Sequence, residues 1–327
     1  MNDRAVSVLE NYDFEIVRTQ KSRNAILCET NKGWMILKEY RGQRFRLELL
    51  EKLLEEISDS GFGRAEHLIR TKEGELICLD QEQTPCIVKT WPGGRECSLK
   101  DGQECRAAVA ALATLHKAMR RPELAAQSDI RAQSLLEEYE KRNRELRRVR
   151  KFLREKGQKT AFEICLQQNF DGFWEEALRV TEEVRAYKEV LCAKEDEREG
   201  TFFHGDFQHH NLLFSGGASI INFEKFGLGC QMRDLYLFLR KLLEKTNWSV
   251  PLARGLLDVY GMEKKLTAAD FLQLYYRFAY PEKFWKIANF YYNSGKAWIP
   301  GRNMEKLEKL VDLRKAKNAF LEQTFSL

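Results

Sequence analysis

Short apolar runs separated by polar turns are frequent in the first 90 residues of this 327-residue chain. Runs such as "NAILCETN", "GWMILKEY" and "PCIVKTW" are rich in aliphatic and aromatic residues and are separated by polar turns, a pattern typical of β-strands. One segment, residues 44–57, instead repeats apolar residues at helical spacing, and Gly61 can end this helix. The pattern therefore predicts a small antiparallel sheet with one helix. The apolar positions of the helix are Leu47, Leu50, Leu54 and Ile57.

From residue 101 the periodicity becomes helical and stays so over most of the remaining chain. The segment "TWPGGRECS", residues 90–98, lies between the two patterns, and its Pro-Gly-Gly predicts a bend. We therefore expect an α+β fold with two lobes. The predicted parts are a strand-rich lobe at 1–90, a hinge at 91–98 and a helical lobe at 99–327, which carries a polar loop at 204–224.

Composition narrows the class of protein. Hydrophobic residues make up 43% of the chain and charged residues 31%, as in soluble globular proteins. No apolar stretch approaches the roughly 18–20 residues that span a bilayer, and the N-terminus has no signal-peptide pattern. We expect a cytoplasmic protein without a membrane partner. The eight cysteines form no CxxC pair, so reduced thiols are expected and neither a zinc nor a haem site is.

The segment "TFFHGDFQHHNLLFSGGASIINFE" concentrates polar residues suited to phosphoryl transfer. That reaction needs a carboxylate to orient the acceptor hydroxyl, oxygen ligands for Mg²⁺ and a cation on the phosphates. Asp206 suits the first role, and Asn211 and Asn222 can offer oxygens to the metal. The alternative is a purely structural Asp/Asn loop. His204 is expected to pack under the loop, and the adjacent pair His209 and His210 predicts no metal site, because consecutive residues point in different directions.

These motifs resemble those of the aminoglycoside phosphotransferase and choline kinase group. "HGDFQHHN", "INFE" and "RDLYLFLRKLLEK" are similar to its catalytic and metal loops, and "YPEKFWKIANFYYNSGKAWI" is similar to the spore coat protein CotS family within it. The resemblance spans about residues 15–322. It implies a bilobed protein-kinase-like fold of the aminoglycoside phosphotransferase type, with ATP and Mg²⁺ as cofactors and a small hydroxyl-bearing substrate. It also implies spore coat proteins as partners, and a location in the mother-cell cytoplasm or the spore coat.

The resemblance assigns roles to several positions. Asp206 corresponds to the catalytic base, Asn211 to a metal ligand and Lys38 to the lysine that contacts the phosphates. Trp91 belongs to the hinge that faces an adenine, and Asp234 corresponds to a residue that supports the catalytic loop.

The carboxylate partner of Lys38 is expected from the helix at 44–57. Glu48, Glu51 and Glu55 all point away from its leucine seam, and Glu51 is our prediction among the three. Without the resemblance, Lys38 would be interpreted as an exposed strand lysine.

Two positions depart from the pattern of an active kinase. Asn222 stands where such a kinase has its metal-binding Asp, and Mg²⁺ is normally held by one or two carboxylates. Glu224 would lie on the same side of an extended strand, so we predict that it compensates. The segment "VRTQKSRNAIL" has no glycine to bring its backbone close to phosphates, and Arg23 is predicted to bind them instead.

Two functions remain open at this point. The favoured hypothesis is a degenerate pseudokinase with an assembly or binding role in the spore coat, because Asn222 lacks the charge of an Asp. The other is an active ATP-dependent phosphotransferase that uses Asp206 as base on a hydroxyl acceptor.

The helical lobe carries two further features. Residues 141–159 hold ten Lys and Arg against two Glu. This segment predicts either a solvated helix face or a surface for an acidic coat partner, and no nucleic-acid motif accompanies it. The aromatic residues near the C-terminus are predicted to pack helices together, and Tyr291 or Trp298 is a candidate for lining an acceptor pocket. These aromatic residues are Trp285, Phe290, Tyr291, Tyr292 and Trp298.

Overall fold

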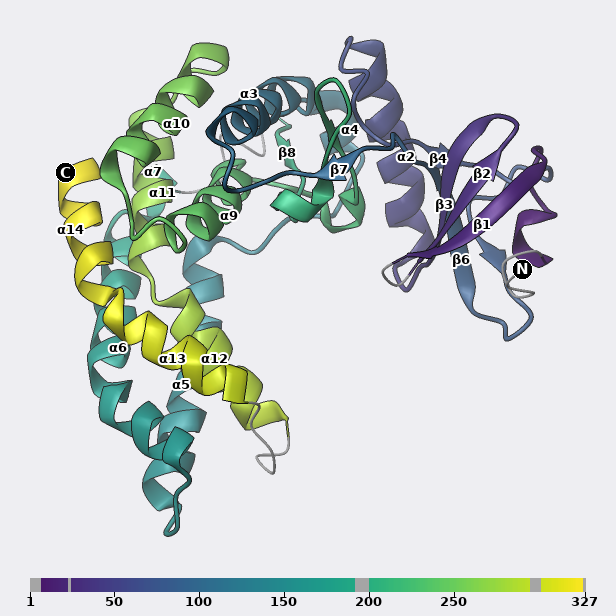
Figure 1. Ribbon diagram of the computed structural model, residues 1–327. Helices are drawn as coiled ribbons and strands as arrows, with labels where there is room; N and C mark the ends of the chain where they lie inside the picture. The colour runs from purple at the N-terminus through teal and green to yellow at the C-terminus, as the bar shows by residue number, and fades with distance from the viewer. Residues whose placement is uncertain (1–6, 23–24, 192–199, 295–300, 326–327) are drawn as a thin grey trace. The chain divides into compact units, whose positions relative to one another are not determined.

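The structure is a computed structural model that describes residues 7–22, 25–191, 200–294 and 301–325 (Figure 1). The chain divides into two compact units, each built from segments that are distant in sequence. The lobe and hinge boundaries predicted above stay predictions. The first unit comprises Met1–Arg131, Asp196–Leu237 and Val259–Lys264, and the second comprises Ala132–Glu195, Phe238–Asp258 and Lys265–Leu327.

An antiparallel sheet opens the first unit, as the pattern of short apolar runs predicts. Its strands follow the order β1-β2-β3-β6-β4, and β5 also pairs with β6. Gly33, the first residue of β3, follows the turn after β2 and has a φ of 102°, a conformation that glycine adopts without strain. The strands are β1 (Ile16–Ser22), β2 (Ala25–Thr30), β3 (Gly33–Glu39), β4 (Leu68–Ile69), β5 (Cys78–Leu79) and β6 (Pro85–Thr90).

Helix α2 (Arg44–Asp59) confirms the one helix predicted among these strands. All four predicted apolar positions are buried on it. Ser60 caps its C-terminus, and Gly61 follows with a φ of 90°, the left-handed conformation that commonly terminates helices.

The rest of the first unit carries the polar loop between short strands. Strands β10, β9 and β7 form a three-stranded sheet, and β11 pairs with β8. The carboxylate of Asp101 accepts the N–H groups of Gln103 and Glu104 and so caps the following helix α3. The remaining elements are β7 (Arg95–Glu96), α3 (Gly102–Ala118), α4 (Pro122–Ala126), β8 (Phe202–Phe203), η1 (His209–Asn211), β9 (Leu212–Phe214), β10 (Ala218–Ile220), η2 (Phe223–Lys225) and β11 (Gly227–Leu228).

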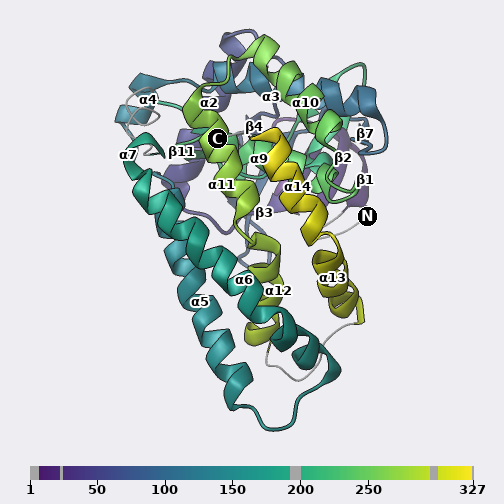
Figure 2. The same ribbon diagram turned by 90° about the vertical axis from the view of Figure 1, so that its left-hand side faces the viewer.

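The second unit is helical. Figure 2 shows α5 and α6 running alongside each other as a long hairpin. Each begins with a capping box, made by Ser134 with Glu137 and by Thr160 with Glu163, so local sequence fixes both starts. Helices α9 and α10 are each shared between the units. The helices are α5 (Leu135–Glu155), α6 (Ala161–Ala186), α7 (Lys188–Leu191), α9 (Met232–Leu243), α10 (Val250–Glu263), α11 (Ala268–Ala279), α12 (Glu282–Asn293), α13 (Gly301–Asp312) and α14 (Arg314–Thr324).

Aromatic packing in this unit confirms only part of the prediction. Tyr291 is buried against Phe162 and donates a hydrogen bond to Glu163. Phe290 instead has 57% of its surface exposed, so its predicted packing role is wrong. Trp298 lies outside the described residues. Within the described part of the chain, no helix combines the length and apolarity needed to span a membrane.

Candidate functional site

Asp234, in the first turn of α9, supports the loop that begins at His204. Its buried carboxylate accepts the backbone N–H of His204 at 2.6 Å and that of Gly205 at 2.8 Å, and it lies 3.2 Å from Nε2 of His116. Burial alone would raise the pKa of Asp234, but the hydrogen bonds and nearby imidazoles outweigh it and keep the pKa below its usual value. This is the supporting role that the resemblance implies.

His204 and Gly205 are fixed by close packing. Nε2 of His204 donates to the carbonyl oxygen of Ile221 at 3.0 Å, while Nδ1 accepts the N–H of Asp206 at 3.1 Å. His204 therefore packs under the loop, as predicted. Gly205 has a φ of 82°, and a Cβ there would lie 2.1 Å from the carbonyl oxygen of Lys225, so no larger residue fits.

Asp206, the predicted base, lies on this loop with both carboxylate oxygens engaged. Oδ1 accepts Nε2 of Gln208 at 2.6 Å, and Oδ2 accepts Nζ of Lys225 at 2.9 Å. Burial would raise the pKa of Asp206, but these two donors outweigh it and lower the pKa. The side chain of Lys225 is 68% exposed, so this ion pair adds little stability and can open.

Two asparagines connect the loop to the turn after β10. Asn211 donates from Nδ2 to the carbonyl oxygen of Asp206 at 2.8 Å, and its Oδ1 accepts Nδ2 of Asn222 at 2.8 Å. Asn222 adopts the left-handed conformation, with φ 67° and ψ 56°, which Asn tolerates better than most residues. Its Oδ1 accepts Nζ of Lys38 at 2.8 Å. Since lysine can only donate, this contact fixes which way the Asn222 amide points.

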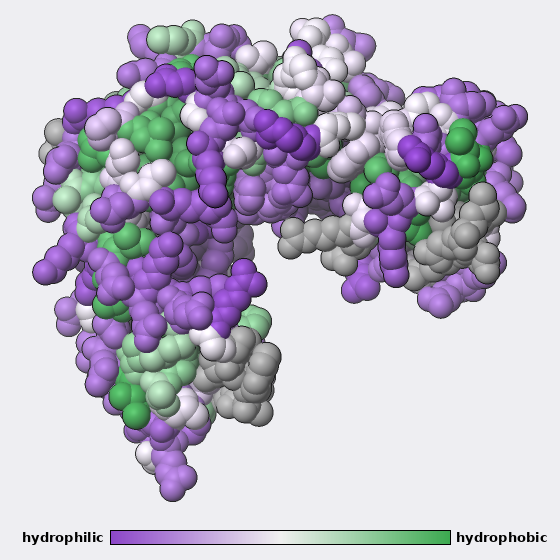
Figure 3. All heavy atoms as spheres, in the orientation of Figure 1, coloured by the Kyte–Doolittle hydropathy of each residue, from purple (hydrophilic) through white to green (hydrophobic). Residues whose placement is uncertain are grey.

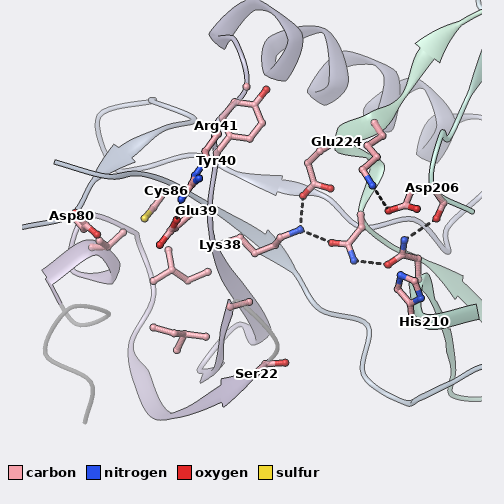
Figure 4. Close-up of a pocket in the computed structure, with 18 of the residues that line it drawn as sticks. Ser22, Lys38, Glu39, Tyr40, Arg41, Asp80, Cys86, Asp206, His210 and Glu224 are labelled. Carbon is pink, nitrogen blue, oxygen red and sulfur yellow. Dashed lines mark hydrogen bonds and ion pairs between the residues drawn. The ribbon is translucent and has the colours of Figure 1, made fainter. Parts of the chain in front are cut away.

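A cluster of two lysines and two glutamates lies against these asparagines, and we call it the paired cluster (Lys38, Lys89, Glu66 and Glu224). Lys89 is fully buried, and its Nζ lies 2.8 Å from Oε1 of Glu66 and 2.6 Å from Oε1 of Glu224. Lys38 reaches the same Glu224 oxygen at 3.1 Å, as the dashed contacts in Figure 4 show for these labelled residues. Glu66 also accepts the N–H of Phe223 at 3.1 Å.

Within the paired cluster, the pKa values of Lys89 and Glu224 shift toward the charged forms. Burial would lower the pKa of Lys89, but Glu66 and Glu224 outweigh it and raise the pKa. Burial would raise the pKa of Glu224, but Lys89 and Lys38 outweigh it and lower the pKa. Each buried charge therefore has a partner inside the protein.

The sheet explains why the two lysines meet. Lys38 pairs with Ile87 across β3 and β6, and Lys89 follows Ile87 by two residues. Residues two apart on a strand share a face, so the two lysines are diagonal neighbours on one face. Lys89 and Glu66 were not predicted from the sequence. The available signal was a charged residue inside the apolar strand "CIVKT".

The structure corrects the predicted partner of Lys38. Nε of Arg70 donates to Oε1 of Glu51 at 2.7 Å, while Lys38 pairs with Glu224, so the predicted Lys38–Glu51 pair is wrong. Lys38 is also no freely exposed strand lysine.

Trp91 and Arg23 are the two other residues that we predict to contact a nucleotide. The backbone N–H of Trp91 bonds to the carbonyl oxygen of Trp34 at 2.8 Å, but Trp91 is not among the residues that line the cavity described next. Arg23 lies outside the described residues. Both roles stay predictions.

A cavity of about 1090 Å³ opens beside the paired cluster. Asp206, Asn211, Asn222 and Glu224 all line it, together with Lys38. The cavity is large enough for a nucleotide-sized ligand. The other charged residues that line it are Lys21, Glu39, Arg41, Arg46, Asp80 and Lys225.

The donor set at the predicted metal position does not fit Mg²⁺ in this arrangement. Oδ1 of Asn211 accepts one hydrogen bond, whereas Oδ1 of Asn222 and Oε1 of Glu224 each accept two lysine ammonium groups. We predicted that Glu224 follows Asn222 along an extended strand, and this is wrong. The short helix η2 turns the chain at Phe223–Lys225. Among the residues that the structure describes, no group of three or more His, Cys, Asp and Glu could hold a metal.

Solved structures share this fold. An aminoglycoside phosphotransferase from Alicyclobacillus acidocaldarius subsp. acidocaldarius DSM 446 aligns with a TM-score of 0.84 at 18% identity, over 98% of this chain and 94% of that one. Spectinomycin phosphotransferase APH(9)-Ia in its AMP-bound complex aligns with a TM-score of 0.66 at 14% identity, over 98% and 97%. Amicoumacin kinase hAmiN in complex with AMP-PNP, Ca²⁺ and Ami aligns with a TM-score of 0.61 at 14% identity, over 99% of this chain and 94% of that one. The predicted aminoglycoside phosphotransferase-type fold is confirmed.

Sequence comparison identifies the family. Curated protein sequences give no match. The family described as "Spore coat putative kinase YutH" matches residues 6–324, which confirms the resemblance to kinase-like spore coat proteins. Because this match covers nearly the whole chain, the protein belongs to the spore coat putative kinase YutH family.

Proposed function

We propose that this protein is a non-catalytic kinase-fold component of the spore coat, with a binding or assembly role in place of Mg²⁺-dependent phosphoryl transfer. One observation carries the proposal: Lys38 and Lys89 place their ammonium groups on Asn222 and Glu224, where the resemblance expects a metal ion.

Electrostatics supports this function. Two positive and two negative charges balance within the paired cluster, so it needs no further cation. Two unit charges at about 4 Å repel by about 4 kcal/mol at an effective dielectric constant near 20. A divalent cation beside two ammonium groups would meet a multiple of this repulsion, unless bound phosphates compensated for it.

The proposal includes location and partners. The protein acts in the mother-cell cytoplasm and becomes part of the spore coat, where coat proteins are its partners. No membrane or nucleic-acid partner is proposed. ATP remains a candidate ligand of the cavity beside Lys38, bound without a need for Mg²⁺.

A second candidate function is an active phosphotransferase acting on a small hydroxyl-bearing acceptor. The observation in its favour is Asp206, whose lowered pKa keeps it ionised at neutral pH and whose exposed partner Lys225 can move away. An ionised carboxylate in the cavity can orient an acceptor hydroxyl and accept its proton. In this alternative the metal must first displace the lysines from Asn222 and Glu224.

Nucleotide binding and turnover in the full-length protein distinguish the two functions. We would measure thermal unfolding with ATP in excess Mg²⁺ and in excess EDTA, and phosphate release in Mg²⁺ and Mn²⁺. A ligand at about 100 times its Kd stabilises a protein by about 2.7 kcal/mol. We expect any ATP stabilisation to be equal in Mg²⁺ and EDTA, and no phosphate release above background.

Asp206→Asn and Asp13→Asn form a matched pair for this experiment. Asp13 is 86% exposed and pairs only with Lys32 among the described residues. Metal-dependent phosphate release that Asp206→Asn abolishes and Asp13→Asn retains would overturn the proposal and establish the phosphotransferase.

A further inference from the structure

A second cavity, of about 440 Å³, lies in the helical unit among residues near the C-terminal end of α9, on α12 and on α13. Seven of its eleven lining residues are Lys or Arg, and one is a glutamate, Glu244. We call this cavity the lysine groove. Hydrophilic side chains prevail on the face over α12 and α13 in Figure 3. The cations are Arg240, Lys241, Lys245, Lys283, Lys286, Lys306 and Lys309.

Internal ion pairs neutralise only part of this charge. Glu244 accepts Arg240 at 2.9 Å and Lys283 at 3.0 Å, and Lys286 pairs with Glu282. Four lysines lack a carboxylate partner among the described residues, and Lys306 has only a 3.4 Å contact with Asn303. These four are Lys241, Lys245, Lys306 and Lys309.

The crowding has a cost within the protein. Burial lowers the pKa of Lys241, and the nearby cations Arg240, Lys245 and Lys283 lower it further, against the opposite effect of Glu244. Like charges gathered on three helices do not stabilise a fold. An anionic ligand would offset the repulsion among these lysines, and it would be attracted electrostatically by all of them.

The groove also has an apolar side. Phe290 is 57% exposed and lines it together with the mostly buried Ile287. An exposed aromatic ring within a cationic rim resembles the centre and rim of a protein interface. A small inorganic anion would use the lysines and leave Phe290 bare, whereas a peptide with both acidic and apolar side chains can contact both.

The net charge of the helical unit also favours an acidic ligand for the lysine groove. The helical unit contains 29 Lys and Arg against 21 Asp and Glu, while the first unit contains 25 against 28. The net positive charge of the chain therefore comes from the helical unit, which favours acidic partners.

We propose that the lysine groove binds an acidic segment of a partner protein, with its carboxylates on the four unpaired lysines and an apolar side chain on Phe290. This docking site goes beyond the proposed function and does not depend on nucleotide or metal in the other cavity.

The test uses the full-length protein and short fluorescein-labelled peptides followed by anisotropy. The main probe alternates glutamate with leucine. A second replaces each glutamate with glutamine, and a third replaces each leucine with serine. We expect the main probe to bind best, and its affinity to fall steeply with added salt, because exposed charge pairs are screened.

Matched variants locate the binding. Lys245→Gln/Lys309→Gln removes two exposed groove lysines, and Lys141→Gln/Lys315→Gln removes two exposed lysines elsewhere in the same unit. We expect the groove variant to bind the main probe about tenfold more weakly, equivalent to about 1.4 kcal/mol, and the control to change it less than about twofold. Phe290→Ala should weaken the main probe several-fold and leave the serine probe unchanged.

Three results would overturn the proposal. Equal losses in the groove and control variants would mean unspecific attraction to the positive unit. Equal binding of the leucine and serine probes would remove the role of Phe290. Competition by inorganic triphosphate that is as strong as that of the unlabelled main peptide, and is unchanged in Phe290→Ala, would make the groove a site for small polyanions.

Discussion

The two cavities gather lysines in opposite ways. In the paired cluster, fully buried Lys89 has two carboxylate partners and Lys38 has one. In the lysine groove, Lys245 and Lys309 are exposed and lack such partners among the described residues. A paired charge is satisfied within the fold and is costly to disturb, whereas an unpaired charge is available to a ligand. We therefore interpret the first set of lysines as part of the architecture of the site and the second as a surface for a partner.

The largest effect is expected from Lys89→Met. This change leaves Glu66 buried without its ammonium partner and Glu224 with only Lys38. Removing one member of a buried ion pair costs about 3–5 kcal/mol, so the free energy of unfolding in urea should fall by about this amount. Lys309→Met, on the exposed face of α13, should change it by less than about 0.5 kcal/mol.

A second variant keeps this prediction testable if Lys89→Met does not fold. Lys89→Met/Glu66→Gln removes a charge of each sign, and we expect it to recover part of the lost stability, because the uncompensated buried carboxylate is gone. If Lys89→Met is as stable as the wild type, the cluster is not the architectural element that we describe.

Acid should lower the contribution of the paired cluster to the free energy of unfolding, by less than Lys89→Met does. The pKa of Glu224 is lowered in the folded protein, so its contribution to stability is full above its unfolded pKa of about 4.3. It is lost as the pH falls through the lower folded value. Each unit of pKa shift is worth about 1.4 kcal/mol.

Urea unfolding at several pH values tests this linkage. Between about pH 5 and pH 3, the wild type should lose at least about 1 kcal/mol more stability than Glu224→Gln, which cannot titrate at this position. Asp206 and Asp234 titrate in both proteins, so their contributions cancel in the difference in stability between the wild type and Glu224→Gln. Parallel curves would contradict the lowered pKa of Glu224.

The sequence predicts the part of the candidate site whose signal is local. Asp206, Asn211 and Asn222 lie within one short segment of the chain, and all three line the same cavity. Lys38 follows from the strand pattern combined with the resemblance.

Partner choice is not local, and here the sequence was insufficient. Helical periodicity offers Glu48, Glu51 and Glu55 equally as partners of Lys38, whereas the actual partner, Glu224, is far away in the chain and is placed by a left-handed Asn222. A strand pattern cannot show that Lys89 is buried between two glutamates.

The lysine groove is beyond local patterns for the same reason. Its lysines come from segments near residues 241–245, 283–286 and 306–309, each of which alone looks like an ordinary solvated helix face. The aromatic neighbours of Phe290 predict a helix-packing role for it, because periodicity alone does not separate it from buried Tyr291.

The smallest effect has the opposite sign from the largest, and it tests the comparison most directly. Lys245→Met/Lys309→Met removes repulsion among groove cations instead of breaking a pair, so it should raise the free energy of unfolding by a few tenths of a kcal/mol at low ionic strength. The gain should vanish near 1 M salt, where the screening length is about 3 Å. Urea unfolding at both salt concentrations, with Lys141→Met/Lys315→Met as the control, measures it. A clear loss of stability in the groove variant alone would show that these lysines have partners within the fold and are not available to a ligand.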